Sequence, residues 1–595
     1  MRHQKRLDME TEISKSVAKF LEEKYQLHQD PEQITLQKTK SEFEGELTLV
    51  VFPFLRASKK SPEQTAEEIG SYLKENTPSV ADFNVVKGFL NLSLNQGTWL
   101  STLKSLSTNK QITASDQTLM VEYSSPNTNK PLHLGHIRNN FLGYSVAEIL
   151  KANGNKVLKT QIINDRGIHI CKSMLAWKKY ANGATPDSAG IKGDHFVGDY
   201  YVMFEHYYKK EMEELMQRGM TKEEAMQEAP SFKEAGEMLR DWENGKPEVV
   251  ELWETMNQWV YDGFESTYKA MGVDFDHLYY ESNTYKLGKN IVEEGIEKGV
   301  FYRREDGSVW CDLTAEGLDE KLVLRKDGTA VYMTQDIGTA IERYRDHKID
   351  GIVYTVGNEQ EYHFKVLFLI LKKLGYDFWE GLYHLSYGMV ELPSGRMKTR
   401  EGTVVDADDI MEEMISTAAK ATAEKGKMEG YSAAEINEIN RRIGMAALKY
   451  FILKVDPRKG MVFNPEESID FNGNTGPFVL FNYVRTQSVL AKYGKALDSD
   501  QIEAVSFTDK EIEIIGKLAD YPKVLQQAAK EFSPSIIANY CYDLAKDYSQ
   551  FYAAHQILKE ENEALKEIRL LLSQKLGAIL KNGLELLGIE TVDRM

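Results

Sequence analysis

The sequence is poor in cysteine and has no long apolar run. Its 595 residues include three cysteines, Cys171, Cys311 and Cys541. These lie too far apart in the chain to predict a disulfide framework or a zinc cluster. The densest apolar run, residues 366–371, is far too short to cross a bilayer, and residues 1–16 hold no apolar stretch fit for a signal peptide. We therefore expect a soluble, cytoplasmic protein with no membrane partner and no structural metal.

Positively charged residues are outnumbered by acidic ones, 73 Lys and Arg against 91 Asp and Glu. The formal net charge is −18 at pH 7, which at face value argues against a nucleic-acid partner. The acidity is uneven, however, because residues 205–298 contain 22 Asp and Glu against 11 Lys and Arg. From residue 441 onward the two signs are nearly balanced. Local basic patches can bind phosphates on an acidic protein, so a nucleic-acid partner stays open.

The pattern of apolar residues divides the chain into three parts. Two alternating segments, residues 47–51 and 90–94, flank a helical stretch at residues 62–76. This order predicts a small α+β domain over residues 1–112. The polar segment STNKQITASDQ, residues 107–117, marks its boundary.

The second and third parts differ in their periodicity. Over residues 113–405, apolar strands, glycine-bearing turns and amphipathic helices alternate. This alternation predicts a multidomain α/β protein with a doubly wound parallel sheet, whose ligands lie at the carboxyl ends of the strands. The acidic stretch 193–299 interrupts it and predicts a helical insertion. Beyond residue 405 strand signals end and apolar residues recur at helical spacing, so residues 406–595 are expected to form an α-helical bundle.

The strongest local pattern is SSPNTNKPLHLGHIRN, residues 124–139. A strand ends in a loop with two prolines, and a helix begins near His133 and His136. The two imidazoles share one face of the helix start, where they can donate hydrogen bonds to phosphate oxygens. The helix N-terminus also favours anions, and Gly135 allows a backbone or an adenine ring to approach. A bare His-x-x-His is more often structural, or a metal site, but the strand, loop and helix around it favour nucleotide binding.

Residues 133–136, His-Leu-Gly-His, resemble the His-Ile-Gly-His signature of class I aminoacyl-tRNA synthetases. The preceding string VEYSSPN, residues 121–127, resembles the form found in arginyl-tRNA synthetases, and this longer match is the more specific. The resemblance covers nearly the whole chain. It implies a Rossmann-like catalytic domain, ATP with Mg²⁺ as co-substrate, and L-arginine and tRNA(Arg) as substrates.

The second signature of this class, of Lys-Met-Ser-Lys-Ser type, is expected late in the catalytic domain. The candidate is GRMKTREGT, residues 395–403, in which a threonine replaces the second lysine. A solvated basic turn is the alternative. Arginyl enzymes often show this departure, and a lysine just before the first signature, here Lys130, is thought to compensate. Lys130, Lys398 and Arg400 therefore stay open for the phosphate-stabilising role, and Met397 is expected beside ATP.

Selection of arginine requires carboxylates, because a guanidinium is planar and permanently charged. Tyr332 and Asp336 are four residues apart and share a face if a helix begins there. In arginyl-tRNA synthetases a similar Tyr-x-x-x-Asp lines the guanidinium pocket, together with a glutamate that matches Glu122. A helix N-cap role for Asp336 and an exposed strand position for Glu122 are the alternatives.

The same resemblance assigns the rest of the small-molecule site. Asn127 and Gln360 would hold the α-amino and carboxylate ends of the amino acid. His363 would lie near ATP. Glu281, in YYES, is a weaker candidate for a further carboxylate.

The C-terminal segments 471–490 and 539–558 resemble the anticodon-binding helical domain of the arginyl, cysteinyl and methionyl enzymes. Unstacked loop bases can stack there on aromatic side chains. The candidate tRNA contacts are Tyr483, Arg485, Tyr548, Phe551 and Tyr552, although a place in the core is the stronger alternative for any one of them. The N-terminal part resembles the added domain of arginyl enzymes, thought to touch the tRNA.

The implied reaction has two steps, adenylation of arginine and its transfer to the tRNA, with no covalent enzyme intermediate. One alternative is a cysteinyl-type synthetase, but three scattered cysteines with no histidine cluster argue against its zinc site. A second is a non-catalytic tRNA-binding paralogue, favoured only by the incomplete second signature. A third, a small nucleotidylyltransferase, does not explain the large helical C-terminal part. We expect a monomer.

Overall fold

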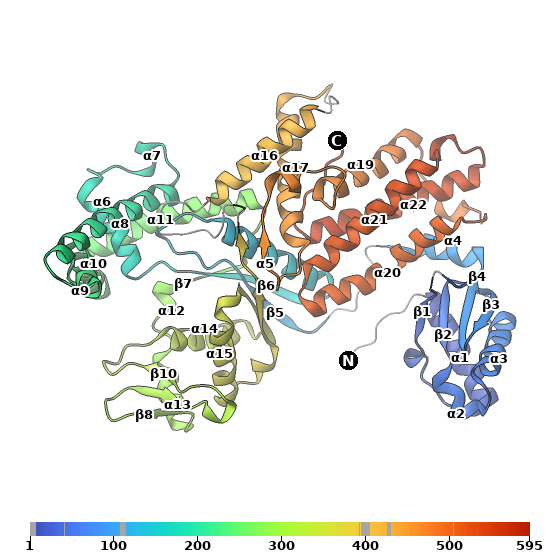
Figure 1. The fold of residues 1–595 in the computed structure, drawn as a ribbon, viewed down its shortest axis with the longest axis horizontal. Coiled ribbons are helices and arrows are strands. Elements are labelled where there is room, and N and C mark those ends of the chain that lie inside the picture. Colours follow the sequence, from blue (N-terminus) through green and yellow to red (C-terminus); the bar gives the residue numbers. More distant parts are fainter. Residues whose placement is uncertain are drawn as a thin grey trace.

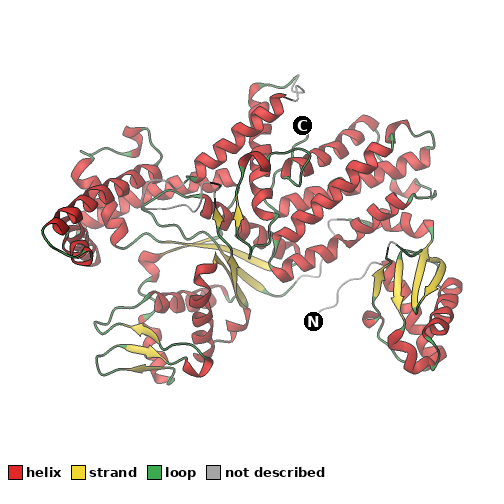
Figure 2. Ribbon diagram, viewed as in Figure 1, coloured by secondary structure: helices red, strands yellow, loops and turns green. Residues whose placement is uncertain are grey.

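The structure is a computed structural model of the 595-residue chain, drawn in Figures 1 and 2. It describes residues 8–40, 42–107, 115–391, 393, 405–424, 430–503 and 505–594. A parallel sheet lies at the centre of the molecule. The N-terminal α+β unit and a helical insertion lie toward opposite ends of it (Figure 1).

The N-terminal unit is an antiparallel sheet covered by helices. Its strands are ordered β1-β2-β4-β3, and its helix α3 (Pro62–Asn76) begins with a capping box, in which Ser61 and Gln64 bond each other's backbone amides. The strands are β1 (Leu36–Lys38), β2 (Leu47–Val50), β3 (Val80–Val86) and β4 (Phe89–Leu94), and the other helices are α1 (Asp8–Tyr25), α2 (Leu55–Ser58) and α4 (Gln96–Ser105). The expected α+β unit is confirmed.

The central sheet is fully parallel, with strand order β12-β11-β5-β6-β7. Its strands are β5 (Thr118–Glu122), β6 (Lys156–Ile163), β7 (His277–Tyr280), β11 (Gly351–Gly357) and β12 (Leu382–Tyr387). The associated helices are α5 (Leu134–Ala152), α14 (Tyr332–His347) and α15 (Glu361–Lys373). From β5 the next strands in the chain, β6 and β7, lie toward one edge of the sheet, whereas from β11 the next strand, β12, lies toward the other edge. Loops after these two strands therefore diverge and open a crevice at their carboxyl ends.

Two insertions interrupt the α/β alternation. The first is helical and lies between β6 and β7. Its bounds differ from the predicted span 193–299, because its helices begin before residue 193 and because β7, a strand of the central sheet, lies inside that span. Its helices are α6 (Ile168–Tyr180), α7 (Pro186–Ala189), α8 (Gly193–Gln217), α9 (Lys222–Glu228), α10 (Pro230–Glu243) and α11 (Pro247–Met271). The second follows α12 (Glu281–Thr284) and α13 (Lys289–Glu297). It is a small antiparallel sheet of β8 (Phe301–Arg303), β9 (Val309–Cys311) and β10 (Lys321–Leu324), which the sequence analysis did not anticipate.

The C-terminal part is a helical bundle. Its helices are α16 (Ala407–Glu424), α17 (Ala433–Leu453), α18 (Pro465–Ser468), α19 (Gly476–Tyr493), α20 (Asp509–Glu531), α21 (Pro534–Ala554) and α22 (Glu563–Leu586). One exception to the all-helical expectation is β14 (Met461–Val462), which pairs in parallel with β13 (Val390–Glu391). No helix in the described ranges combines the length and apolar character needed to cross a membrane.

The bundle is docked onto α5, the helix that carries the first signature. Ser145 of α5 donates a buried hydrogen bond from its Oγ to the carbonyl of Leu586 at 2.7 Å. Lys449 of α17 donates to the carbonyl of Gly588, and its ammonium lies over the ring of Phe141 in α5. The segment that follows α22 therefore closes over the side of α5 that faces the bundle.

Candidate active site

The crevice at the carboxyl ends of β5 and β11 gathers most of the predicted small-molecule residues. The loop after β5 carries Asn127, Lys130 and His133, and β11 leads into Gln360 and α15. Glu281 directly follows β7, the edge strand. Because parallel strands all end at one edge, residues from distant parts of the sequence meet there.

His133 and His136 cap the N-terminus of α5. His133 is the N-cap residue, and its Nδ1 accepts the amide of Gly135 at 3.1 Å. Nδ1 of His136 in turn accepts the amide of His133 at 3.1 Å. A Cβ on Gly135 would lie 2.9 Å from the His133 ring, so this glycine makes room for the capping imidazole. Its predicted place beside an adenine ring stays a prediction.

The caps determine which nitrogen of each imidazole can donate. Burial and the charge of Lys130 lower the pKa of His133 to about 4. Burial, His133 and Lys130 hold the pKa of His136 well below its ordinary value. Both rings are therefore neutral near pH 7, and since each Nδ1 accepts a backbone N–H, each ring carries its proton on Nε2. Each neutral ring already carries an Nε2–H that can donate to a phosphate oxygen. The nearby ammonium of Lys130, whose pKa is lowered by burial, adds a cation to these donors.

A second group of side chains is acidic. Asp336, on the second turn of α14, is bonded to Nε2 of His363 at 2.6 Å. Burial, together with the charges of Asp165 and Asp336, raises the pKa of Glu281 to about 6 despite the opposing charge of Arg166. The charge of Asp336 is the smallest of these causes, and paired carboxylates are what a guanidinium pocket would require. Tyr332, at the start of α14, is 72 % exposed.

Glu122 already holds a guanidinium of its own chain. Its carboxylate forms a buried ion pair with Arg343 of α14, whose guanidinium lies 4.7 Å from the ring centre of Tyr279. Glu122 is therefore buried and paired with a guanidinium, whereas Asp336 and Glu281 are half-buried. Sequence spacing could not reveal this partner.

Asn127 and Gln360 are exposed beside the crevice. Asn127 forms an isolated parallel bridge with Asn164, which holds the loop after β5 against the end of β6. The predicted second-signature residues Met397, Lys398 and Arg400 lie outside the described residues.

Asp165 was missed by the sequence analysis. Its carboxylate accepts from the amide and hydroxyl of Ser282 at 2.8 and 2.7 Å and from the hydroxyl of Tyr261 at 3.0 Å. Its carbonyl accepts from Trp253 and Asn257 of α11. Asp165 thus joins the ends of β6 and β7 to the insertion and fixes the backbone beside Glu281. A polar Asn-Asp pair directly after an apolar strand was the available signal, because such positions lie at the ligand edge.

The aromatic residues proposed to contact tRNA are mostly in the core. Tyr548 and Phe551 are fully buried and Tyr483 is 5 % exposed, so none of the three presents a ring to solvent for a base to stack on. This corrects the expectation for them, since their helical period marks the inner faces of α19 and α21. Arg485 lies nearer the surface, with its guanidinium 4.9 Å from the ring centre of the partly exposed Tyr552.

Family models match three consecutive parts of the chain. Residues 9–94 match the arginyl tRNA synthetase N terminal domain, residues 101–464 the catalytic domain of tRNA synthetases class I (R), and residues 479–595 the DALR anticodon binding domain. This order of domains, with a parallel sheet whose first helix carries the paired histidines, defines a class I aminoacyl-tRNA synthetase.

Comparison with individual relatives identifies the family within this class. The chain is 58 % identical to the arginine–tRNA ligase of Bacteroides thetaiotaomicron and 57 % identical to that of Parabacteroides distasonis, in each case over 99 % of this chain and all of the relative. Its fold matches the Thermus thermophilus arginyl-tRNA synthetase with a TM-score of 0.78 at 25 % identity, covering 98 % of this chain and 99 % of that one. The chain belongs to the arginyl-tRNA synthetase family, and the cysteinyl alternative is excluded.

The protonation of the paired histidines can be observed directly. We expect the ring resonances of His133 and His136 to stay at their neutral positions from pH 8 down to about pH 5, because their folded pKa values are depressed. His195 should titrate above its ordinary pKa, because its hydrogen bond to Asp408 raises that value. NMR of histidine-labelled protein, assigned by single substitutions, measures this. Titration of His133 or His136 near pH 6.5 would contradict the assigned tautomers.

Substitutions at two neighbouring positions can distinguish a core residue of the helical bundle from a surface residue. Phe551→Ala should lower the free energy of unfolding by about 3–5 kcal/mol, because it opens a cavity in the bundle. Tyr552→Ala should cost less than about 1 kcal/mol, since the ring is at the surface. Denaturant unfolding followed by circular dichroism compares the two. Equal losses would show that Phe551 is not a core residue.

Proposed function

We propose that this chain activates L-arginine with ATP to arginyl-adenylate and transfers the arginine to the 3′ end of tRNA(Arg). The observation that carries the proposal is that one edge of the parallel sheet carries both the two capping imidazoles, after β5, and the carboxylate of Glu281, after β7, while Asp336 is bonded to His363 of α15 after β11. The donors suit the phosphates of ATP and the carboxylates suit a guanidinium.

ATP binding is assigned to the N-terminus of α5. The Nε2–H groups of His133 and His136 would bond phosphate oxygens, and Lys130 would offset charge on them. This donor set, imidazole and ammonium with no carboxylate, fits a Mg²⁺ ion that arrives with the nucleotide. Such an ion would neutralise phosphate charge when bound. Met397, Lys398 and Arg400 are proposed to complete the ATP site, and His363 to lie near it.

Arginine binding is assigned to Asp336 and Glu281, with Tyr332 beside them. Glu122 is proposed to act through its buried ion pair with Arg343 of α14. Asn127 and Gln360, both exposed at the crevice, are proposed to hold the α-amino and carboxylate groups. The amino-acid carboxylate can then attack the α-phosphate in line, so catalysis depends on positioning and on charge stabilisation.

The remaining assignments concern the tRNA and the cellular context. The DALR domain is proposed to bind the anticodon arm, with Arg485 and Tyr552 as the surface contacts. The chain is proposed to act as a cytoplasmic monomer. An editing step is not needed, because a charged substrate is separable by its hydrogen bonds alone.

The test of the proposed function is ATP–pyrophosphate exchange with arginine, lysine and cysteine in turn, with and without tRNA. We expect exchange with arginine only. Exchange that needs tRNA would also support the mechanism usual in this family. Folded protein that exchanges with no amino acid in the presence of its own tRNA would refute the proposal in favour of a binding paralogue.

Arginine affinity should depend on pH through Glu281. Its raised pKa of about 6 means that the carboxylate gains a proton as pH falls through 6. The KM for arginine should therefore rise between pH 7.5 and pH 5.5 in the unaltered chain. Glu281→Gln should remove most of this dependence, while the KM for ATP stays within about twofold. A dependence that persists in Glu281→Gln would assign it to another group.

Asp336→Asn provides the companion test. Loss of a charged hydrogen-bond partner for a guanidinium costs about 1.5–3 kcal/mol, so the KM for arginine should rise roughly tenfold to a hundredfold. Exchange kinetics measure it, and Asp319→Asn, an exposed carboxylate outside the pocket, is the matched control. An unchanged KM for arginine in Asp336→Asn would remove Asp336 from the pocket.

A further inference from the structure

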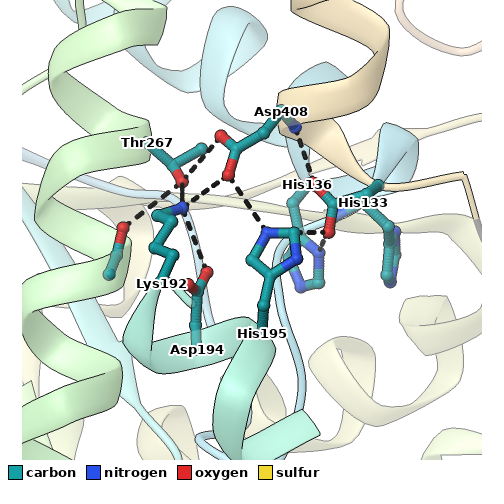
Figure 3. Close-up of polar contacts among 9 residues, drawn as sticks. His133, His136, Lys192, Asp194, His195, Thr267 and Asp408 are labelled. Carbon is teal, nitrogen blue, oxygen red and sulfur yellow. Dashed lines mark hydrogen bonds and ion pairs between the residues drawn. The ribbon is translucent and has the colours of Figure 1, made fainter. Parts of the chain in front are cut away.

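A polar cluster beside the first signature joins the insertion to the C-terminal bundle (Figure 3). Its centre is Asp408, on the first turn of α16. Oδ2 of Asp408 accepts from Nζ of Lys192 at 2.6 Å and lies 3.2 Å from Nε2 of His195. Oδ1 accepts from the hydroxyl of Thr267 at 3.0 Å. Lys192 and His195 lie at the start of α8 and Thr267 lies on α11, so one carboxylate binds two helices of the insertion.

The positive charge in this cluster is supplied by the ammonium of Lys192. Asp194, His195 and Asp408 bring potential ligand atoms within 4.8 Å of one another, as in some metal sites. The ammonium of Lys192, however, lies 2.6 Å from Asp408 and 3.3 Å from Asp194 and balances their charge. Although burial opposes it, hydrogen bonds from His195 and Lys192 hold the pKa of Asp408 at about 2. The cluster is therefore an ion-paired connection between elements.

The backbone next to Asp408 is paired with the first signature. Asp406 forms an antiparallel bridge with His133, and the amide of Ala407 donates to the carbonyl of Leu132 at 2.9 Å. Oδ1 of Asp406 accepts the amide of Asp408 at 2.7 Å, which fixes the turn between them. Any displacement of Asp408 is thus transmitted through two residues to the N-cap of α5.

The insertion also supports the first signature from a second direction. Gly198, on the second turn of α8, lies against the segment just before the signature. A Cβ at this position would be 2.9 Å from Cδ of Pro131 and 3.6 Å from Cα of Lys130. Close approach without a side chain lets α8 pack directly on the Lys130–Pro131 backbone. The same helix that carries His195 therefore backs the loop that carries Lys130.

We propose that Lys192 and Asp408 are positioning residues for ATP, which hold the backbone of residues 130–136 in the geometry that aims Lys130, His133 and His136 at the phosphates. The inference rests on the assignment of ATP to these residues in the proposed function. Neither Lys192 nor Asp408 is assigned a contact with the nucleotide. Their effect is transmitted through α8 and through the 406–408 backbone, and small displacements of binding groups can cost large factors in affinity or rate.

The test compares charge-removing variants of the cluster with a matched ion pair elsewhere in the insertion. Asp408→Asn keeps the shape of the side chain, and Lys192→Met removes the ammonium. Lys192→Arg restores the charge. The control is Lys246→Met, because Lys246 also bridges two carboxylates, Asp241 and Glu248, at 3.0 and 3.3 Å, but is exposed. Equilibrium dialysis with Mg²⁺-ATP gives Kd for each variant, exchange kinetics give KM for ATP and for arginine, and thermal unfolding gives Tm.

We expect Kd and KM for ATP to rise about tenfold or more in Asp408→Asn and in Lys192→Met. The KM for arginine should change less than twofold, Lys192→Arg should recover most of the ATP affinity, and Lys246→Met should match the unaltered chain.

Folded variants that bind ATP within twofold of the unaltered chain would overturn the inference. Equal losses for ATP and arginine would overturn it too, since they would indicate general structural damage. ATP affinities that follow the expected pattern in a protein that shows no arginine-dependent exchange would refute the proposed function and leave the positioning role standing.

Discussion

The bonding of the first amides of α5 is the constraint on which the active site depends. A helix N-terminus exposes N–H groups that require acceptors, and here two are satisfied by imidazole Nδ1 atoms of His133 and His136. Acceptance at Nδ1 places the ring proton on Nε2, so the capping bond and the bond proposed to a phosphate use different nitrogens of one ring. Because the depressed pKa values keep the rings neutral, the cap and the donors persist together through the physiological pH range. The insertion, the sheet and the bundle all meet around this helix end.

Much of the fold could be predicted because its determinants are local. The apolar strand before VEYSSPN, the prolines and the amphipathic helix after His136 lie within about thirty residues of sequence, and β5 and α5 form where this pattern places them. The small sheet β8–β10 was also detectable. Asp-Gly pairs at residues 306–307 and 327–328 lie between short apolar runs, which is a strong hairpin signal.

The contacts that complete the site could not be predicted, because they join residues far apart in the sequence. Asp408 meets Lys192 across 216 residues, and Glu122 meets Arg343 only because β5 and α14 pack together. Spacing identifies Glu122 as a carboxylate at a strand end but does not reveal which guanidinium it holds. The predicted tRNA contacts among the aromatic residues of α19 and α21 were wrong for a related reason. Composition shows that a helix is rich in Tyr and Phe, whereas burial depends on neighbours that a single helix does not specify.

The hydrogen bond between Ser145 and the carbonyl of Leu586 spans 441 residues, which has a consequence for biosynthesis. At ribosomal rates of about 5–20 residues per second, roughly 20 to 90 s separate the synthesis of the two partners. During that interval the side of α5 that the bundle later covers has no partner, and its apolar residues are available to chaperones or to aggregation. The helix that carries the histidine pair is therefore made long before the segment that encloses it. A truncated chain would carry the histidine pair on an unfinished core, which gives cellular quality control a means to recognise it.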